Sequence, residues 1–494
     1  MNLSLISHEL LVAVLGLVLL LVDLWLPPSS KHKLGYAAAL GVGAILVYSL
    51  LAVKPVSPAP VPDALSKMYA LDGLALFFKR FFLLAALIVL VMSVEFSDRI
   101  EAGIGEFYAL ILFALCGMLF AASANDFALL FVSLELITVT FYVLTSFQRA
   151  KMTSLEAGVK YLIVGALSTA FTVYGIALVY GTSHTLNFSE LAGVAGTLSA
   201  NRIFLFGLVL VMAGLGFKIA AFPFQIWAPD VYQGAPVPAT AFLAVGSKAA
   251  GFALLLRVLF IAVPDVTAKW ANLIIIISGI TILYGNLCAI PQRNVKRLLG
   301  YSSIAHAGYL LLGVAALAGT IGSQAQDAKA GGSAMLYYLS GYLFTVLGAF
   351  TVICLVMRHV DGEDVSALAG LNQRSPLLAA TMTLAMVSLA GIPPLAGFFG
   401  KFLLLKSVIQ QGPDRPGCYC LAFTAVAGVV ISLYFYFGVV RAIYWSNDVP
   451  DRSPIAISKP IRVSIYGCIA GMFYLGLFPN AFVDMASQAV TVLR

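Results

Sequence analysis

The sequence predicts an all-α polytopic membrane protein of about fourteen transmembrane helices, and three observations lead to this prediction. Of the 494 residues, 61% are hydrophobic and only 10% are charged, against roughly 25% charged in ordinary soluble domains. The apolar residues gather in runs of about 20, which is the length of helix that crosses a bilayer. The connections between these runs are short, so the chain has no room for a soluble catalytic domain.

Each apolar run is one expected span, and the first reads as a retained helix because no basic stretch precedes it and no small-residue cleavage site follows. With the N-terminus outside, Lys and Arg are more frequent in the cytoplasmic connections, so both termini are expected on the outer, periplasm-like side. The expected spans are 5–26, 36–53, 73–95, 106–124, 126–147, 157–181, 203–221, 237–263, 270–290, 299–318, 333–357, 377–410, 418–445 and 463–479.

Several classes of function are disfavoured by what the sequence lacks. The six cysteines are scattered, with no C-x-x-C pair and no Cys/His ligand spacing, so neither a metal site nor a disulfide framework is expected. No glycine-rich nucleotide motif, P-loop or H-E-x-x-H motif occurs. The net charge of +7 does not come from a basic tail or a cluster of basic residues. We therefore expect no redox centre, no bound nucleotide and no nucleic-acid partner, and lipids as neighbours.

Two of the expected helices are interrupted. The seventh runs into FPFQIWAPDVYQGAPVP, whose prolines remove backbone donors, and the twelfth is cut by AGIPPLAGFFG. Such backbone survives at membrane depth only where protein or a cavity surrounds it. Paired broken helices indicate the inverted repeats of transporters. We therefore expect an N-terminal unit (1–105), repeats of five helices at 106–263 and 264–445, and a C-terminal helix (446–494), with Lys218 corresponding to Lys401.

Charged residues lie where a membrane helix should carry none. Each costs roughly 2.5 to 3.5 kcal/mol at a helix centre, so a chain that keeps several is expected to use them. Glu135 is the candidate anion, with hydroxyls three and seven positions further along the same helix face. Burial disfavours both charged forms and pairing restores them, so we expect Glu135 and Lys218 to pair. The candidate cations are Lys160, Lys218, Lys248 and Lys401.

His306 adds a group that exchanges protons near neutral pH, on a polar face of the tenth span. For each candidate a structural role is the alternative: a static ion pair for Glu135, a hydrogen-bonded packing residue for His306, and a side chain that reaches the membrane surface for Lys160. The structural role is the better interpretation of four further charged residues, namely Asp23, Arg257, Arg441 and Lys406.

The stretches AGLGFKIAAFPFQIWAPDVYQGAPVPATAFLAVGSKAAGFALLLR, NVKRLLGYSSIAHAGYLLLG and SLAGIPPLAGFFGKF resemble the antiporter-like subunits of respiratory complex I, and among them the N subunits. The resemblance covers nearly the whole chain. It implies proton translocation across a bacterial inner membrane, coupled to quinone reduction in other subunits. It also implies roles for Glu135 with Lys218 as a pair, for Lys248 at the centre, for Lys401 towards the exit, and for further polar positions at His306 and Lys160.

The same resemblance implies which groups lie elsewhere. NADH, FMN, the iron–sulfur clusters and quinone are expected in other subunits, with no cofactor in this chain. The expected partners are the antiporter-like M subunit, the small K, J, A and H subunits, and membrane lipids. Two alternatives remain open: a subunit of a multisubunit Na⁺/H⁺ antiporter, whose fold is the same, and a scaffold of the membrane arm that moves no protons.

Overall fold

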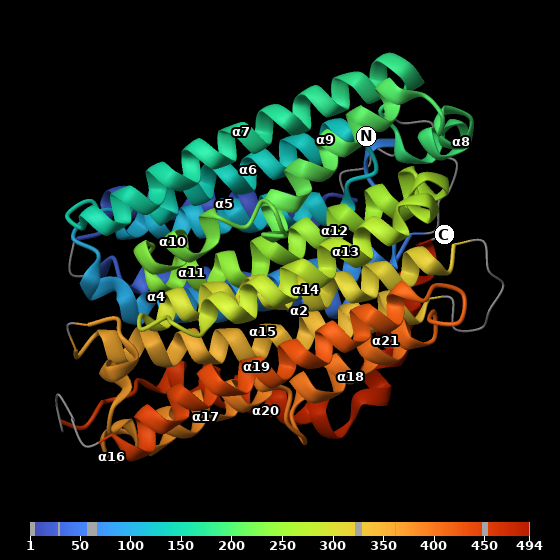
Figure 1. The fold of residues 1–494 in the computed structure, drawn as a ribbon. Helices are drawn as coiled ribbons and strands as arrows, with labels where there is room; N and C mark the ends of the chain where they lie inside the picture. Colours follow the sequence, from blue (N-terminus) through green and yellow to red (C-terminus); the bar gives the residue numbers. More distant parts are fainter. Residues whose placement is uncertain are drawn as a thin grey trace.

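The computed structural model describes residues 5–27, 30–56, 67–321, 329–360, 362–446 and 453–493. In these residues the chain folds into a bundle of long helices that run between two ends of the molecule (Figure 1). The unbroken membrane-length helices are α1 (Ser7–Trp25), α2 (Lys33–Leu51), α4 (Gly73–Phe96), α5 (Ile104–Ser123), α6 (Phe127–Thr145), α7 (Met152–Ser183), α9 (Arg202–Ile219), α13 (Pro264–Ala289), α14 (Val295–Gly319), α15 (Ala330–Met357), α19 (Gly417–Trp445) and α20 (Lys459–Leu477).

The eighth expected span is one continuous rod built of four pieces. These are α11 (Val237–Phe242), the π-helical η3 (Leu243–Ser247), α12 (Lys248–Arg257) and the π-helical η4 (Val258–Ala262). With this rod, thirteen helices of the described residues are long and apolar enough to cross a membrane. The fourteenth is the broken twelfth span, whose halves α17 (Pro376–Ala390) and α18 (Ala396–Ile409) are each too short to qualify alone. The all-α membrane fold is confirmed.

The two predicted breaks have the same backbone pattern. After α9 and after α17 the chain turns through a left-handed residue, Ala220 (φ 58°) and Gly391 (φ 84°) respectively. In each case the next residue donates its N–H to the carbonyl oxygen five positions earlier, which satisfies a helix-end acceptor. The first break then leads into the short helix α10 (Trp227–Gly234) and the second into α18.

The connections that flank α6 and α14 also share one pattern. Before α6, Phe127 N donates to Leu186 O (3.0 Å), which follows α7. Before α14, Val295 N donates to Glu363 O (2.8 Å), which follows α15. The first pairing is followed along the chain by the short helix α8 (Phe188–Leu198), and the second by the 3-10 helix η5 (Val365–Leu368) and the short helix α16 (Leu371–Arg374). The helices α8 and α16 lie at opposite ends of the bundle (Figure 1).

In two pairs of neighbouring helices, α5 with α6 and α13 with α14, a glycine of the first helix lies close to the backbone of the second. A Cβ added to Gly117 of α5 would lie 3.1 Å from Ile137 N of α6. A Cβ added to Gly285 of α13 would lie 2.4 Å from Ala305 N of α14. Gly117 and Gly285 are separated by the same number of residues as Ile137 and Ala305. The pair α5 and α6 therefore packs in the same register as the pair α13 and α14.

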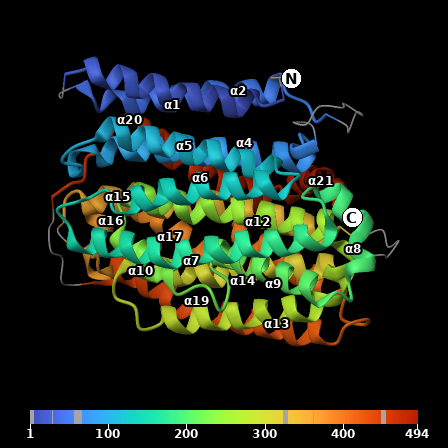
Figure 2. The ribbon, with the colours of Figure 1, turned by 90° about the horizontal axis from the view of Figure 1, so that it is seen from above.

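The most deeply buried helices are the rod from Val237 to Ala262, α14 and α15. Helices such as α7 and α19 surround them and expose large apolar side chains, as expected for contact with lipid. The α1 and α2 hairpin forms one edge of the molecule and α13 lies at the opposite edge (Figure 2). Both labelled termini lie at one end, where α21 (Pro479–Ala489) follows α20.

Candidate functional site

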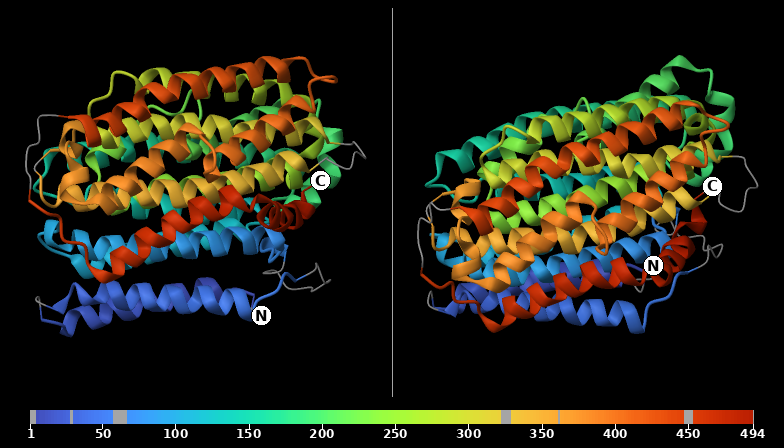
Figure 3. Two further views of the ribbon diagram at one scale, coloured as in Figure 1. Left: turned by 90° about the horizontal axis from the view of Figure 1, so that it is seen from below. Right: turned by 60° about the horizontal axis from the view of Figure 1, so that its bottom comes forward.

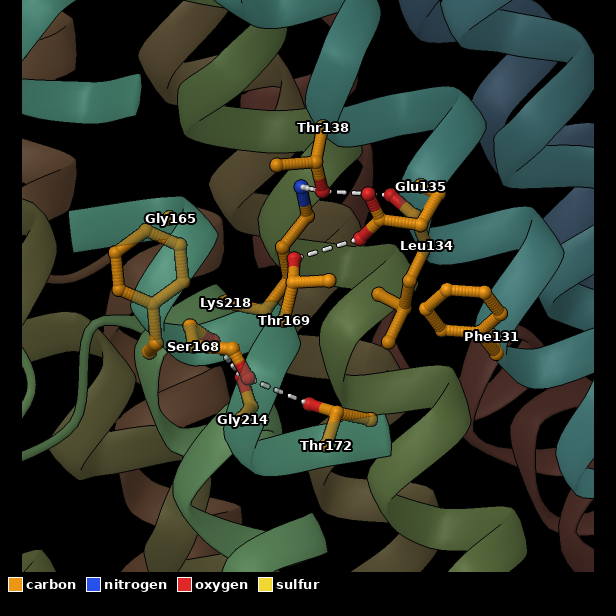
Figure 4. Close-up of a pocket in the computed structure, with 11 residues that line it drawn as sticks. Phe131, Leu134, Glu135, Thr138, Gly165, Ser168, Thr169, Thr172, Gly214 and Lys218 are labelled. Atoms are coloured by element: carbon orange, nitrogen blue, oxygen red, sulfur yellow. Dashed lines mark hydrogen bonds between the residues drawn. The ribbon is translucent and has the colours of Figure 1, made fainter. Parts of the chain in front are cut away.

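Glu135 and Lys218 meet around a small cavity between α6, α7 and α9 (Figure 4). The Lys218 ammonium, 3% exposed, donates to Thr138 Oγ1 at 3.0 Å. Glu135 Oε1 accepts from Thr169 Oγ1 at 2.8 Å. The cavity measures about 20 Å³, room for about one water molecule. The two side chains thus line one polar cavity, but each contacts a different hydroxyl group and no direct ion pair joins these two described residues, so the expected pairing is not a direct contact.

Lys248 is held by Ser303 at the centre of the molecule. Its ammonium donates to Ser303 O at 2.5 Å and also to Ser303 Oγ. The same hydroxyl is hydrogen-bonded to Tyr232 Oη at 2.8 Å and to Tyr342 Oη at 3.0 Å. Lys248 is 4% exposed and begins α12 directly after the π-helical turn η3. The central lysine is therefore surrounded by uncharged oxygen atoms.

His306 lies in α14 between two tyrosines. Its Nδ1 is hydrogen-bonded to Tyr338 Oη, and its Nε2 lies 3.0 Å from Tyr436 Oη. Tyr436 Oη is in turn 2.5 Å from Ser302 Oγ. Both ring nitrogens thus have a hydroxyl partner that can accept or donate a proton. The arrangement fits a relay and also fits a satisfied buried histidine.

Lys401 reaches back across the break in the twelfth span. Its ammonium, on α18, donates to Leu389 O at 2.6 Å and to Ala390 O at 3.4 Å, which are the last residues of α17. The ammonium also lies 4.8 Å from the centre of the Tyr309 ring. A lysine can donate to these carbonyl oxygens because the break leaves the end of α17 without its next helical turn.

Other residues lie between the buried lysines and His306 and link them into a continuous series of contacts. The Lys218 stem packs against Gly251, one turn beyond Lys248 on α12. The Tyr342 ring lies 5.8 Å from the Lys248 ammonium and 5.1 Å from the His306 ring. The Tyr309 ring lies beside both His306 (5.9 Å) and Lys401. Four predicted residues, Lys218, Lys248, His306 and Lys401, therefore belong to one buried polar line.

Lys160 stands apart from this line. Its side chain is 46% exposed, and its ammonium pairs with Glu156 (2.7 Å) and Asp230 (2.8 Å). Arg297 Nη1 pairs with the same Asp230 at 2.5 Å. The expectation of a buried Lys160 is therefore wrong. The helix α7 turns this residue towards the outside of the bundle, where carboxylates neutralise the lysine.

Lys218 and Lys401 do not occupy matching positions around the two breaks. Lys218 lies two residues before the left-handed Ala220, a place that Leu389 takes before Gly391. Lys401 lies on the second half of its helix. The expected correspondence of the two lysines is wrong at residue level, although both breaks carry a buried ammonium. The Lys401 ammonium nevertheless lies at the Leu389 carbonyl oxygen, and Leu389 is the residue that matches Lys218 in the backbone pattern of the two breaks.

The charged residues expected to be structural contact acids or lie at the surface. Arg257 is fully buried and binds Asp72 Oδ1 at 2.9 Å and Ala122 O at 2.8 Å. Asp23 pairs with Lys31 at 2.8 Å. Two more, Lys406 and Arg441, have exposed side chains. These positions agree with the structural interpretation of each residue.

Sequence reasoning missed a buried ion pair between α1 and α4 and the hydroxyl groups of the polar line. Lys79 of α4 and Glu9 of α1 pair at 2.5 Å and are almost fully buried, with Tyr69 beside them. Glu9 lies at the start of its span, where a charged residue is common and so does not indicate a buried site. Ser303 and Tyr342 are also residues that buried helices commonly carry. In the described part of the chain, the His, Cys, Asp and Glu side chains form no group of three that could hold a metal ion.

These features define a class of protein: a transporter-like bundle with broken helices and a buried line of lysines. The family described as NADH:quinone oxidoreductase/Mrp antiporter, TM matches residues 124–432, and the chain belongs to it.

Individual relatives cover the whole length. The NADH-quinone oxidoreductase subunit N of Moorella thermoacetica is 38% identical over 99% of both chains. The F(420)H(2) dehydrogenase subunit N of Methanosarcina mazei is 36% identical over 99% of this chain and 98% of the relative. A chain of the respiratory complex I of Thermus thermophilus has 32% identity and a TM-score of 0.77, covering 97% of this chain and 99% of that one.

Proposed function

We propose that this chain is a proton-translocating membrane subunit of a respiratory NADH:quinone oxidoreductase, the counterpart of its subunit N. The observation that carries the proposal is the buried line from Lys218 to Lys401, in a chain whose full-length relatives include NADH-quinone oxidoreductase subunits N. Protons move from the cytoplasm to the periplasm across a bacterial inner membrane. Electron transfer from NADH to quinone supplies the free energy from other subunits.

The two-repeat organisation is part of this proposal. The shared pattern of the two breaks, of the connections before α6 and α14, and of the glycine contacts supports repeats at 106–263 and 264–445. The matching connections lie at opposite ends of the bundle, as expected for inverted repeats. The units 1–105 and 446–494 flank them. In this register Ser303 takes the place of Glu135, and His306 takes the place of Thr138.

Each polar group has a role in the proposed mechanism. A charge on Glu135 stabilises the protonated form of Lys218 across their shared cavity, and weakening that interaction favours release of the proton. Lys248 receives it, His306 relays it between its tyrosine partners, and Lys401 delivers it towards the end that carries the termini. Lys160, in its exposed charge cluster, stands where protons enter.

The redox groups belong to other subunits. NADH, FMN, the iron–sulfur clusters and quinone are assigned to the rest of the complex, and the neighbours of this chain are the antiporter-like M subunit and the small K, J, A and H subunits. The similarity to a subunit of F(420)H(2) dehydrogenase fits this division, because one kind of membrane subunit then serves different electron donors.

The test compares proton and sodium movement. In inverted membrane vesicles whose complex carries Lys218→Ala, we expect loss of NADH-driven proton pumping while NADH oxidation by artificial acceptors continues. Loss of sodium movement with proton pumping intact would favour the antiporter alternative. Unchanged pumping in the assembled double variant Lys248→Ala, Lys401→Ala would favour the scaffold alternative.

A further inference from the structure

A large groove lies away from the polar line, between α2, α4, α15 and α21. Its volume is about 550 Å³, and apolar side chains from four helices line it, among them Leu50, Phe81, Leu343 and Met485. Leu50 and Met485 are 57% and 44% exposed, so the groove communicates with the outside of the bundle. Figure 3 shows the α1 and α2 hairpin at the edge of the molecule, with α21 close to the end that carries both termini.

Two adjacent cations on α4 have opposite surroundings. Lys79 points to α1, where Glu9 neutralises it at 2.5 Å. Arg80 lines the groove, and its guanidinium donates to Ser49 O (2.8 Å) and Val53 O (3.1 Å). These acceptors are uncharged, and no described residue that lines the groove is a carboxylate. Arg80 therefore brings to a mainly apolar groove a positive charge that no carboxylate of the described lining neutralises.

The charge of Arg80 lies at the level of a helix end, which is where membrane helices meet the head groups. Val53 lies just beyond Leu51, the last residue of α2, so the guanidinium extends to the level at which that helix ends. The apolar walls continue inward from there along α4 and α15. A long side chain that carries its charge towards a helix end is the usual behaviour of arginine near a membrane surface.

We propose that this groove binds one phospholipid of the membrane, with its phosphate at Arg80 and an acyl chain against the apolar walls. Guanidinium groups bind phosphate oxygens with paired, charge-assisted hydrogen bonds. Basic pockets between membrane helices are recurrent head-group sites. The volume falls within the roughly 300 to 1,000 Å³ of ordinary ligand pockets. The lipid fills the space between α2 on one side and α15 and α21 on the other, and so links the edge hairpin to the bundle.

The test is photolabelling of the whole assembled complex. The complex is placed in nanodiscs of phosphatidylethanolamine with a small fraction of phosphatidylglycerol that carries a diazirine in one acyl chain. After irradiation, labelled peptides are identified by mass spectrometry. We expect label on groove residues of α4 and α15 in the wild type. In Arg80→Gln this label falls by about tenfold, the loss expected when a charge-assisted hydrogen bond is removed.

A matched control and a second variant keep the test decisive. Lys406→Gln removes an exposed cation from α18, outside the groove, and should leave the groove label unchanged. Leu50→Trp should displace the lipid by filling the groove, and it tests the proposal even if Arg80→Gln fails to assemble. Equal label in the wild type and in either groove variant would overturn the proposal. So would wild-type groove peptides without lipid label that instead cross-link to a neighbouring subunit.

Discussion

The buried lysines of the polar line are held by uncharged oxygen atoms. Lys218 donates to a threonine hydroxyl, Lys248 to a serine, and Lys401 to backbone carbonyls. Lys248 and Lys401, which contact only uncharged oxygen atoms in the described residues, can lose a proton without leaving a buried anion that lacks a partner, an outcome that is strongly unfavourable. The static cations have carboxylate partners instead, as in the pair of Lys79 with Glu9. The nature of the partner therefore separates the proposed carriers Lys248 and Lys401 from structural cations such as Lys79.

Ser303→Ala tests the surroundings of the central lysine. The change removes an oxygen that serves Lys248, Tyr232 and Tyr342, and leaving buried donors unsatisfied costs about 1–3 kcal/mol. We expect the NADH-driven pumping rate to fall by about tenfold, the factor that corresponds to about 1.4 kcal/mol. Pumping by assembled complex in vesicles measures this effect. A rate equal to that of Ser407→Ala, a buried serine of α18 outside the polar line, would contradict it.

Glu9→Gln tests a structural site, the buried ion pair of Lys79 with Glu9. Removing one partner of a buried ion pair costs about 3–5 kcal/mol, so we expect less assembled complex and a lower melting temperature. Pumping per assembled complex should stay at the wild-type level, because the pair lies outside the polar line. Native gels and thermal unfolding measure the first effect, and vesicle assays normalised to assembled complex measure the second. Lost pumping in a stable complex would mean that Glu9 takes part in translocation.

At the residue scale, the sequence was informative wherever a residue is costly in a membrane. Lys218, Lys248 and Lys401 stand out for that reason. The hydroxyl partners, such as Ser303, do not, because serine costs little inside a helix bundle. Lys160 was misplaced because apolar composition does not tell which side of a helix faces the bundle, and α7 turns it outward.

At the scale of helices, the two helix breaks position Lys218 and Lys401 in the polar line. At both breaks the chain needs a left-handed residue, and one break uses glycine where the other uses alanine. A residue with a Cβ pays roughly 1–2 kcal/mol in this conformation. The second break is also crowded, because a Cβ on Gly391 would lie 3.0 Å from Lys401 Cδ.

The reciprocal variants Ala220→Gly and Gly391→Ala test this account of the breaks. We expect Ala220→Gly to keep or slightly raise the stability of the complex, since glycine adopts this backbone without strain. Gly391→Ala should lower both stability and pumping, because it strains the turn and displaces Lys401. Melting temperature and vesicle pumping report the two effects. Equal behaviour of the two variants would show that the turns do not set the lysine position.

Close helix packing is tested by Gly285→Leu. A Cβ at this position would lie 2.4 Å from Ala305 N, so a larger side chain must force α13 away from α14. We expect little assembled complex on native gels. Gly181→Leu is the matched control, because nothing lies within 4 Å of a Cβ added there. Comparable assembly of both variants would contradict the close packing of α13 and α14.

At the element scale, the long helices and both breaks were predictable because length, hydropathy and proline are local signals. The short helices α8, α10 and α21 were missed, since each lies in what reads as a connection or a helix end. The π-helical turn before Lys248 was also missed. It depends on the packing of α11 and α12 among their neighbours, which no local pattern records.

On the scale of the whole molecule, the central part of the polar line lies on the helices that are most shielded from lipid. Lys248 belongs to the central rod and His306 to α14, whereas Lys218 lies on α9 just before the first break and Lys401 lies on α18 just after the second. The lipid-facing helices surround this core with apolar side chains. The polar line therefore gives a proton a series of polar groups inside this apolar surround, which is the arrangement that a controlled path requires.

The most direct test of this account is the ratio of protons pumped to electrons transferred in complexes that carry Lys401→Ala or Lys406→Ala. Both lysines lie on α18, but Lys401 is buried beside Leu389 O and Lys406 is exposed. Proton uptake by inverted vesicles is measured together with NADH oxidation by quinone. We predict that Lys401→Ala lowers or abolishes pumping while Lys406→Ala retains the wild-type ratio. A wild-type ratio and rate in Lys401→Ala would contradict the proposal that the buried lysines carry the protons.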